Sequence, residues 1–353
     1  MSQLWRVRSR VRRNDAPGNL GLVADQRTIL IADRITSLGD NVITASLLFS
    51  LHRQFPDVRF LIKAPNQFAV LYASNPAVTV LELDADVDHP SAEIVYKHRP
   101  PKFWKLSGLH RKRFLACLRT LQKPIASGRS SSILAPLYTK KIIRRKLRGT
   151  MHELAYWAEM IRPVLPEMIV PVEYELIFGL EVKEREQGSV HVHLGNGKTN
   201  EPAHPNVLLN ALNEINAIEP ILRLSMSGSP EYAEIAQELF APYKATWIGQ
   251  PDLMDFVREL QSVSLVLTSD SGPAHLAAVV HAPSIVFFSK LSLEPKQWGP
   301  LSPNTICVRS REKCSTCVMR NSCSRNTESN RICGQSYDRE DVIKAFQNLR
   351  IQP

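Results

Sequence analysis

The alternation of apolar and polar positions is clearest in the second half of the chain. Short β-rich runs, typical of strands, alternate there with stretches in which apolar residues recur every three or four positions, typical of helices. The predicted strands are Ser189–Leu194, Pro220–Met226, Lys244–Ile248, Ser264–Thr268 and Ser284–Phe288. The predicted helices are Pro205–Ala217, Pro230–Phe240, Asp252–Leu260 and Pro273–His281. Strands and helices that alternate through short connections form a parallel sheet covered by helices on both faces.

The first half of the chain begins with the same alternation. It predicts a strand over Thr28–Ala32, a helix over Asp40–Gln54 and a second strand over Arg59–Lys63. Apolar residues recur every four positions along this helix, which gives it one apolar stripe, and Pro56 ends it. We therefore expect an α/β protein with two doubly wound domains, in which ligands bind beyond the carboxyl ends of the strands.

Length and proline positions set the expected domain organisation. A chain of 353 residues is too long for one ordinary core and suits two domains. Prolines punctuate the stretch 163–171, after a helical pattern over Met151–Ile161, and place the boundary there. The expected segments are a basic tail (1–27), an N-terminal domain (28–165), a C-terminal domain with a cysteine cluster (166–337) and a terminal helix (338–353).

The composition is that of a globular protein. Apolar residues make up 44% of the chain and charged residues 22%, which excludes a disordered or collagen-like protein. No segment approaches the roughly 18–20 uninterrupted apolar residues that cross a bilayer. The basic N-terminal residues are followed by Asn14-Asp15-Ala16-Pro17-Gly18 rather than by an apolar stretch. We therefore expect no secretory signal and a cytoplasmic location.

The net charge of +10 is concentrated in one segment. Residues 97–148 contain 16 Lys or Arg and no Asp or Glu, so the rest of the chain carries a net charge of −6. Such a segment attracts phosphate, anionic lipid or nucleic acid, unless it is simply a solvated surface. Interleaved aromatic residues such as Phe103 and Trp104 suit both a membrane interface and single-stranded nucleic acid.

Four of the six cysteines form a cluster with the spacing C-x2-C-x5-C-x9-C, namely Cys314, Cys317, Cys323 and Cys333. Cytosolic thiols stay reduced, so the spacing favours four thiolates on zinc or iron. Free thiols and disulfides are the alternatives. Four thiolates leave no open coordination position, so we expect any metal to be structural rather than catalytic.

Two strand-to-helix turns are the candidate anion sites, because the sequence contains no G-x-G-x-x-G, no Walker P-loop and no G-x-S-x-G motif. The first turn runs from Arg34 to Asp40. Gly39 permits a tight turn, and Asp40 stands at a helix N-terminus, where the helix dipole favours an ionised carboxyl. A carboxylate there can take a proton from a substrate hydroxyl as a general base. The alternative is an ordinary helix-capping aspartate.

The second turn covers residues 268–278 and leads from an apolar strand into a helix. The N–H groups of Ser271, Gly272 and Ala274 can point at one anion, which the helix dipole also attracts. Asp270 would repel phosphate, so we expect it to bind sugar hydroxyls. The turn could instead be only a cap, and His275 only a structural hydrogen bonder.

The two turns together resemble glycosyltransferase family 9, the ADP-heptose:lipopolysaccharide heptosyltransferases. Residues 34–44, followed by Phe55-Pro56, are similar to the N-terminal signature of that family. Residues 269–278 resemble its most specific motif, and Trp298-Gly299-Pro300 resembles the segment that follows. Some members also carry the cysteine cluster. The resemblance covers roughly residues 28–349.

The resemblance implies a GT-B fold, in which two Rossmann-like domains face each other across a cleft. It implies inverting, metal-independent transfer of a sugar, with no cofactor for catalysis. The expected donor is ADP-heptose, bound by the C-terminal domain, and the acceptor is a lipopolysaccharide-type or other glycan on the N-terminal side. Asp40 matches the catalytic base. The implied donor contacts are Asn196, Lys198, Thr199, Asp270, Ser271, Gly272 and His275.

A lipid-linked, anionic acceptor would account for the basic segment. We expect Arg34, Arg111, Lys112 and Arg113 to form the anionic contact surface and the protein to touch the inner face of the cytoplasmic membrane. Two alternatives stay open. One is a nucleic-acid-binding protein on a sugar-nucleotide fold, which we do not favour; the other is a nucleotide-sugar epimerase or hydrolase.

Overall fold

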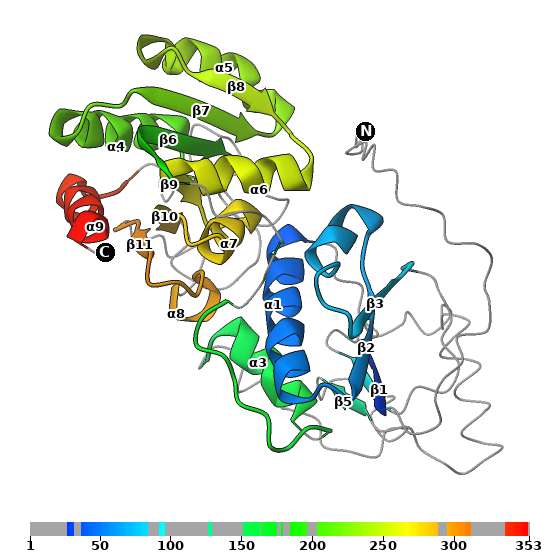
Figure 1. Cartoon of the computed structure of the whole chain (residues 1–353). Coiled ribbons are helices and arrows are strands. Elements are labelled where there is room, and N and C mark those ends of the chain that lie inside the picture. The colour runs from blue at the N-terminus through cyan, green and yellow to red at the C-terminus, as the bar shows by residue number, and fades with distance from the viewer. Residues whose placement is uncertain are drawn as a thin grey trace, which may run out of the picture. The chain divides into compact units, whose positions relative to one another are not determined.

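The structure is a computed structural model (Figure 1). It describes residues 27–31, 37–83, 92–95, 126–128, 151–162, 164–174, 178, 184–195, 203–288, 295–311 and 336–351. Within these ranges, no helix combines the length and the apolar character that spanning a bilayer requires. The expected tail lies outside them except for Arg27, which is the first residue of a strand.

The chain divides into two compact units. The first unit contains residues up to Thr36 and Thr44–Pro171, and the second contains Ser37–Ile43 and Val172–Pro353. The short segment around Asp40 therefore groups with the C-terminal half, whereas the sequence analysis placed it in the N-terminal domain. The terminal helix also groups with the second unit rather than standing apart from it.

The first unit contains a five-stranded parallel sheet in the order β3-β2-β1-β4-β5. Its strands are β1 (Arg27–Ile31), β2 (Val58–Lys63), β3 (Val78–Leu81), β4 (Ala92–Val95) and β5 (Ala126–Gly128). Its helical elements are α1 (Leu38–Gln54, whose first residues belong to the second unit), the short η1 (Asn66–Leu71) and α3 (Glu153–Ile161). The predicted strand–helix–strand beginning is confirmed, and its helix starts two residues earlier than expected.

Helix α1 is buried along most of its length rather than on one stripe. Small polar residues such as Thr44 and Ser46 are as inaccessible to solvent as the apolar Leu47 and Leu48. Its last residue, Gln54, accepts a hydrogen bond from the amide of Ile169 (2.7 Å) and donates one to the carbonyl of Ile169 (2.9 Å). This pair fixes the end of α1 to the segment that leads out of the first unit.

The second unit contains a six-stranded parallel sheet in the order β11-β10-β9-β6-β7-β8. Its strands are β6 (Glu186–Leu194), β7 (Arg223–Gly228), β8 (Thr246–Gly249), β9 (Val263–Ser269), β10 (Ser284–Phe288) and β11 (Thr305–Arg309). This is the strand order of a Rossmann-like fold, and the direction of winding reverses between β6 and β9. The five strands predicted for this half are confirmed, and β11 is an addition.

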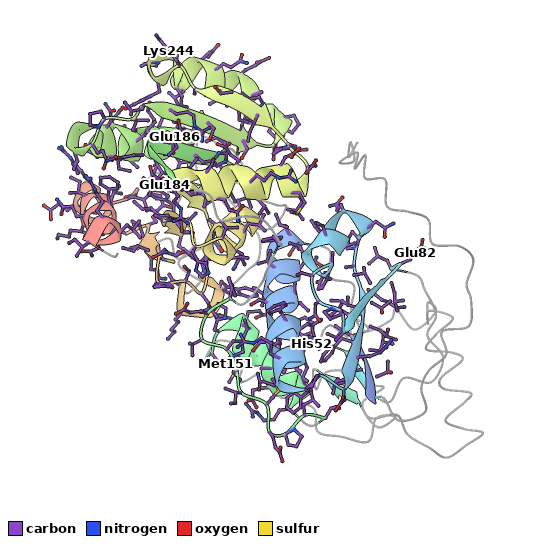
Figure 2. The ribbon with its side chains drawn as sticks, viewed as in Figure 1. His52, Glu82, Met151, Glu184, Glu186 and Lys244 are labelled. Carbon is purple, nitrogen blue, oxygen red and sulfur yellow. The ribbon has the colours of Figure 1, made fainter. Side chains whose placement is uncertain are left out.

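Helices cover both faces of this sheet (Figure 1). They are α4 (Pro205–Ile218), α5 (Ala233–Leu239), α6 (Leu253–Ser262), α7 (Gly272–Val279), α8 (Pro295–Trp298) and α9 (Arg339–Ile351), with short η4 (Pro230–Tyr232) and η5 (Ala241–Tyr243). Side chains of β6 alternate between the two faces. Val190 and Val192 join the core that includes α4 and α9, whereas His191 contacts Phe256 of α6. The chain turns into β8 at Lys244, whose backbone is left-handed with φ of 50° (Figure 2).

The carboxyl ends of β6 and β7 approach each other very closely at Gly228. A Cβ atom at this position would lie 2.3 Å from the carbonyl oxygen of Leu194, which is backbone and cannot rotate away. Only glycine fits there.

We expect Gly228→Ala to lower the free energy of unfolding by more than about 2 kcal/mol, because the two strand ends must separate. Gly249→Ala is the matched control: Gly249 also has a positive φ (65°), but its Cβ would meet nothing closer than 3.7 Å. The control should cost only about 1 kcal/mol, the price of a left-handed backbone. Urea unfolding of both variants measures this, and equal losses would contradict the close approach.

Candidate active site

The reversal of winding between β6 and β9 marks where a ligand is expected to bind in the second unit. In open α/β sheets, ligands occupy the crevice beyond the carboxyl ends of the two strands at such a point. Gly195 follows β6 there, and Asp270 follows β9. The amide of Ala203, which precedes α4, donates a hydrogen bond to the hydroxyl of Ser269 (2.8 Å). This bond fixes the segment that leads into α4 to the end of β9.

The turn between β9 and α7 leaves two backbone amides for an anion rather than three. The amide of Ala274 donates to the carbonyl of Ser271 (3.1 Å), so our expectation that it points at an anion is wrong. Helical geometry uses that N–H within the first turn, and Pro273 has none. The amides of Ser271 and Gly272 are therefore the candidate donors. The Ser271 hydroxyl points back into the turn, where it donates to the carbonyl of Ser269 (2.9 Å).

Asp270 is buried at the base of this turn, with 8% of its surface exposed. Its amide donates to the carbonyl of Phe287 on the neighbouring strand (3.1 Å). Burial raises the pKa of its carboxyl to about 7, because the charged form loses its hydration. Near neutral pH this carboxyl can both accept and donate a hydrogen bond, as contact with sugar hydroxyls requires.

A buried tyrosine holds the ring of His275. Tyr174 lies 101 residues before His275, and its Oη is 2.7 Å from Nδ1 of the ring. Burial raises the pKa of Tyr174 well above its usual value, whereas a hydrogen bond with the backbone of Leu301 lowers it. The hydrogen bond holds the two side chains together, and which of them donates depends on the tautomer of the His275 ring.

The first turn of α1 lies against the first turn of α7, and both belong to the second unit. A Cβ at Gly39 would be 3.0 Å from Cδ2 of the His275 ring, and a Cβ at Gly272 would be 2.6 Å from Cβ of Leu38. Neither glycine can therefore be replaced without displacing a neighbour. The two motifs that the sequence singled out are thus brought together.

Asp40 is the third residue of α1 and not its cap. Ser37 is the cap: its hydroxyl accepts the amide of Asp40 (3.1 Å), and its carbonyl accepts the amide of Asn41 (3.1 Å). The alternative of an ordinary capping aspartate is therefore wrong. Asp40 is partly exposed, on the turn that packs against His275.

Cys307 lies in β11, and burial raises the pKa of its thiol to about 12, with a further contribution from the Asp270 charge. Without a metal it stays protonated at neutral pH, so it is not a nucleophile there. Within the described ranges, no group of three or more His, Cys, Asp or Glu is placed to hold a metal ion.

Several predicted site residues lie outside the described residues: Arg34, Arg111, Lys112, Arg113, Asn196, Lys198, Thr199, Cys314, Cys317, Cys323 and Cys333. Their roles stay predictions. Sequence reasoning missed Tyr174, because nothing in the sequence links a tyrosine after the proline-rich boundary to a histidine of α7. It also missed Ser37, although Ser37-x-x-Asp40 is a helix-start pattern that could have identified the cap.

Part of the second unit matches a known protein family. Residues 216–327 match the sequence model of glycosyltransferase family 9 (heptosyltransferase). This segment includes the turn at Asp270 and α7. No curated protein matches the chain.

Solved structures resemble nearly the whole chain. A glycosyl transferase family 9 protein from Veillonella parvula is 17% identical, with a TM-score of 0.60 over 93% of this chain and 98% of that one. The E. coli ADP-heptose lps heptosyltransferase II is 14% identical, with a TM-score of 0.60 over 93% and 99%. The dodecameric iron-containing heptosyltransferase TibC of enterotoxigenic E. coli, in complex with ADP-D-beta-D-heptose, is 14% identical, with a TM-score of 0.54 over 93% and 78%.

The fold is thus GT-B, as predicted, with two Rossmann-like parallel sheets. Glycosyltransferase is the class of enzyme that the family match indicates. The match over residues 216–327, which contain the second of the two motifs, confirms the resemblance to family 9 over that segment.

The raised pKa of Asp270 predicts an unusual pH dependence of stability. The unfolded carboxyl loses its proton near pH 4, whereas the folded one keeps it up to about pH 7. The folded state is therefore destabilised as pH rises between these values, by up to roughly 1.4 kcal/mol per pH unit. Asp270→Asn should be more stable than the wild type at pH 8, and this advantage should disappear at pH 4.

Urea unfolding at both pH values measures the difference, with the exposed Asp57→Asn as the matched control. A stability difference between Asp270→Asn and the wild type that does not change with pH would contradict a buried, uncharged carboxyl.

Proposed function

We propose that this protein transfers a heptosyl group from ADP-heptose to a glycan acceptor, with inversion at the anomeric carbon. The family match supports glycosyl transfer, and the TibC structure, of similar fold, holds ADP-D-beta-D-heptose. A nucleotide sugar also suits the end of the sheet between β6 and β9, where a helix N-terminus and a buried carboxyl lie side by side.

The observation that carries this proposal is the packing of the first turn of α1 against that of α7. Both helices begin there, so the positive ends of two helix dipoles lie near one another. A diphosphate is the part of a nucleotide sugar that gains negative charge when the sugar leaves. Amides of Ser271 and Gly272, together with Lys198, would stabilise that charge.

Asp40 is proposed as the general base. Its carboxylate takes the proton of the acceptor hydroxyl while the oxygen attacks the anomeric carbon. The bond between that carbon and the phosphate oxygen breaks, and ADP leaves with the electron pair. Asp270 and His275 would hold the hydroxyls of the sugar. Because one displacement occurs at the carbon, the configuration inverts.

We further propose that no metal takes part in this transfer, since amides and Lys198 supply the positive charge. Cys314, Cys317, Cys323 and Cys333 would hold a structural zinc or iron, and the iron-containing TibC makes iron the candidate to measure first. The basic segment 97–148, with Arg34, would bind an anionic, lipid-linked acceptor at the membrane surface.

Asp40→Asn tests the assignment of the base. It keeps the size of the side chain and removes its basicity, so kcat should fall by roughly 10²–10⁴-fold. The Kd for ADP should stay within about threefold, because Asp40 acts on the acceptor. Turnover of ADP-heptose with a heptose-acceptor glycan and calorimetric titration of ADP measure the two quantities, with Asp57→Asn as control.

Normal turnover by Asp40→Asn would contradict the proposed base. Consumption of ADP-heptose by the wild type at full rate without an acceptor would favour an epimerase or hydrolase instead.

A further inference from the structure

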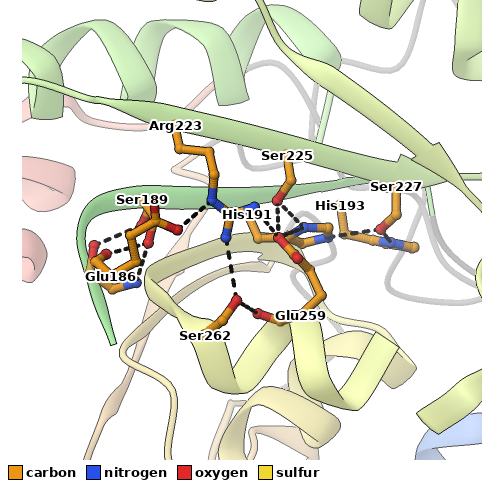
Figure 3. A network of polar contacts seen from close by, with 10 residues as sticks. Glu186, Ser189, His191, His193, Arg223, Ser225, Ser227, Glu259 and Ser262 are labelled. Carbon is orange, nitrogen blue, oxygen red and sulfur yellow. Dashed lines mark hydrogen bonds and ion pairs between the residues drawn. The ribbon is translucent and has the colours of Figure 1, made fainter. Parts of the chain in front are cut away.

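A continuous chain of hydrogen bonds crosses the face of the second sheet that is covered by α6 (Figure 3). It begins at Glu259 on α6 and passes through Ser225, His191 and Ser227 to His193. Oε1 of Glu259 lies 2.5 Å from the Ser225 hydroxyl, which is 2.9 Å from Nδ1 of His191. The Ser227 hydroxyl lies 2.8 Å from Nε2 of His191 and 2.8 Å from Nδ1 of His193.

The carboxylate end fixes the direction of the first two bonds. Glu259 pairs with Arg223, whose Nη1 lies 2.9 Å from the same Oε1 atom. A carboxylate only accepts hydrogen bonds, so the Ser225 hydroxyl must donate to it. The Ser225 oxygen is then available only as an acceptor towards His191. The hydrogen of the His191 ring is therefore on Nδ1.

The same logic continues to the end of the chain. Burial and the charge of Arg223 lower the pKa of His191 to about 3, so its ring is neutral and Nε2 carries no hydrogen. Ser227 must donate to that nitrogen, and its oxygen accepts from Nδ1 of His193. Burial and His191 lower the pKa of His193 to about 3 as well. Nε2 of His193 is thus a bare acceptor.

This acceptor lies at the end of the sheet where a ligand is expected. His193 is the penultimate residue of β6, two positions before Gly195, on the strand that borders the reversal of winding. Its ring packs at 6.0 Å from the ring of Phe256, measured between centroids. No described residue forms a hydrogen bond with its Nε2 atom, and the residue is only half-buried.

We propose that His193 is a donor-binding residue whose Nε2 accepts a hydrogen bond from a ribose hydroxyl of the nucleotide, and that the chain from Glu259 is the positioning device that keeps this nitrogen unprotonated. This inference rests on the proposed function. A bare nitrogen repels phosphate oxygens, so the contact is to a hydroxyl. In Rossmann-like domains the turn after the first strand binds the pyrophosphate and the ribose lies towards the end of the second strand. The second strand here is β7, which His193 contacts through Ser227.

Calorimetric titration with ADP, 2′-deoxy-ADP and 3′-deoxy-ADP tests the contact. His193→Ala should weaken ADP binding about tenfold, the size of one hydrogen bond. One of the two deoxy analogues should bind to the wild type about tenfold more weakly than ADP does. The same analogue should bind to His193→Ala as tightly as ADP does. Unchanged ADP binding by His193→Ala, or fully additive losses with both analogues, would overturn the contact.

Nitrogen-15 NMR of the histidine rings, in the full chain without nucleotide, tests the relay. We expect His193 in the Nδ1–H form, with its signal identified by its absence from His193→Ala. In Glu259→Gln the new amide can donate to Ser225, which reverses every bond in the chain. His193 should then shift towards the Nε2–H form, and ADP should bind more weakly.

Arg258→Gln is the matched control on α6, because Arg258 pairs with the exposed Asp255 and not with the relay. It should leave the His193 ring and ADP binding unchanged. A purely structural Glu259 would lower the melting temperature in Glu259→Gln without changing the ring of His193, and this result would overturn the relay. So would an Nε2–H ring in the wild type.

The two measurements separate the possible failures. If ADP does not bind to the wild type, the proposed function and the ribose contact both fail, while the NMR spectra still decide the direction of the relay. If ADP binds equally to wild type and His193→Ala, only the inference about His193 fails.

Discussion

The site depends on the close packing of the first turns of α1 and α7, where a glycine on each helix makes room for a side chain of the other. Gly39 of α1 faces the ring of His275, and Gly272 of α7 faces Leu38, with no room for a Cβ at Gly272. This approach brings a candidate base, a buried histidine and the free amides of α7 into one compact unit. Two positive helix ends in one place favour an anionic ligand, as the proposed function requires.

Burial determines the protonation of the groups around this contact. Asp270 takes up a proton more readily than an exposed aspartate, whereas His191 and His193 resist protonation. Hydrogen bonds then hold the rings in place: Tyr174 holds the ring of His275, and the chain from Glu259 directs the ring of His193. The site is thus organised before any substrate binds, and preorganised dipoles are the largest electrostatic contribution that an enzyme makes.

Periodicity predicted the second sheet well, because β9 and β10 are mostly apolar runs and β6 and β7 alternate between polar and apolar residues. The bounds of β10 are those expected. The short β3, β4, β5 and β11 have too little pattern to be distinguished from loops. The sequence predicted the two turn motifs as anion sites. It did not predict a role for Tyr174, because its partner His275 lies 101 residues away. In β6, Ser189, His191 and His193 look like a solvated polar face, yet α6 covers them, and only tertiary packing shows it.

Activity of Gly272→Ala, alone and combined with Leu38→Gly, tests the central contact most directly. A methyl group at Gly272 would overlap Leu38, so the single variant should lose at least about tenfold in kcat/KM for ADP-heptose. Removing the Leu38 side chain frees that space, and the double variant should recover a large part of the loss. Wild-type kcat/KM in Gly272→Ala, or no recovery in a double variant that folds normally, would contradict the account.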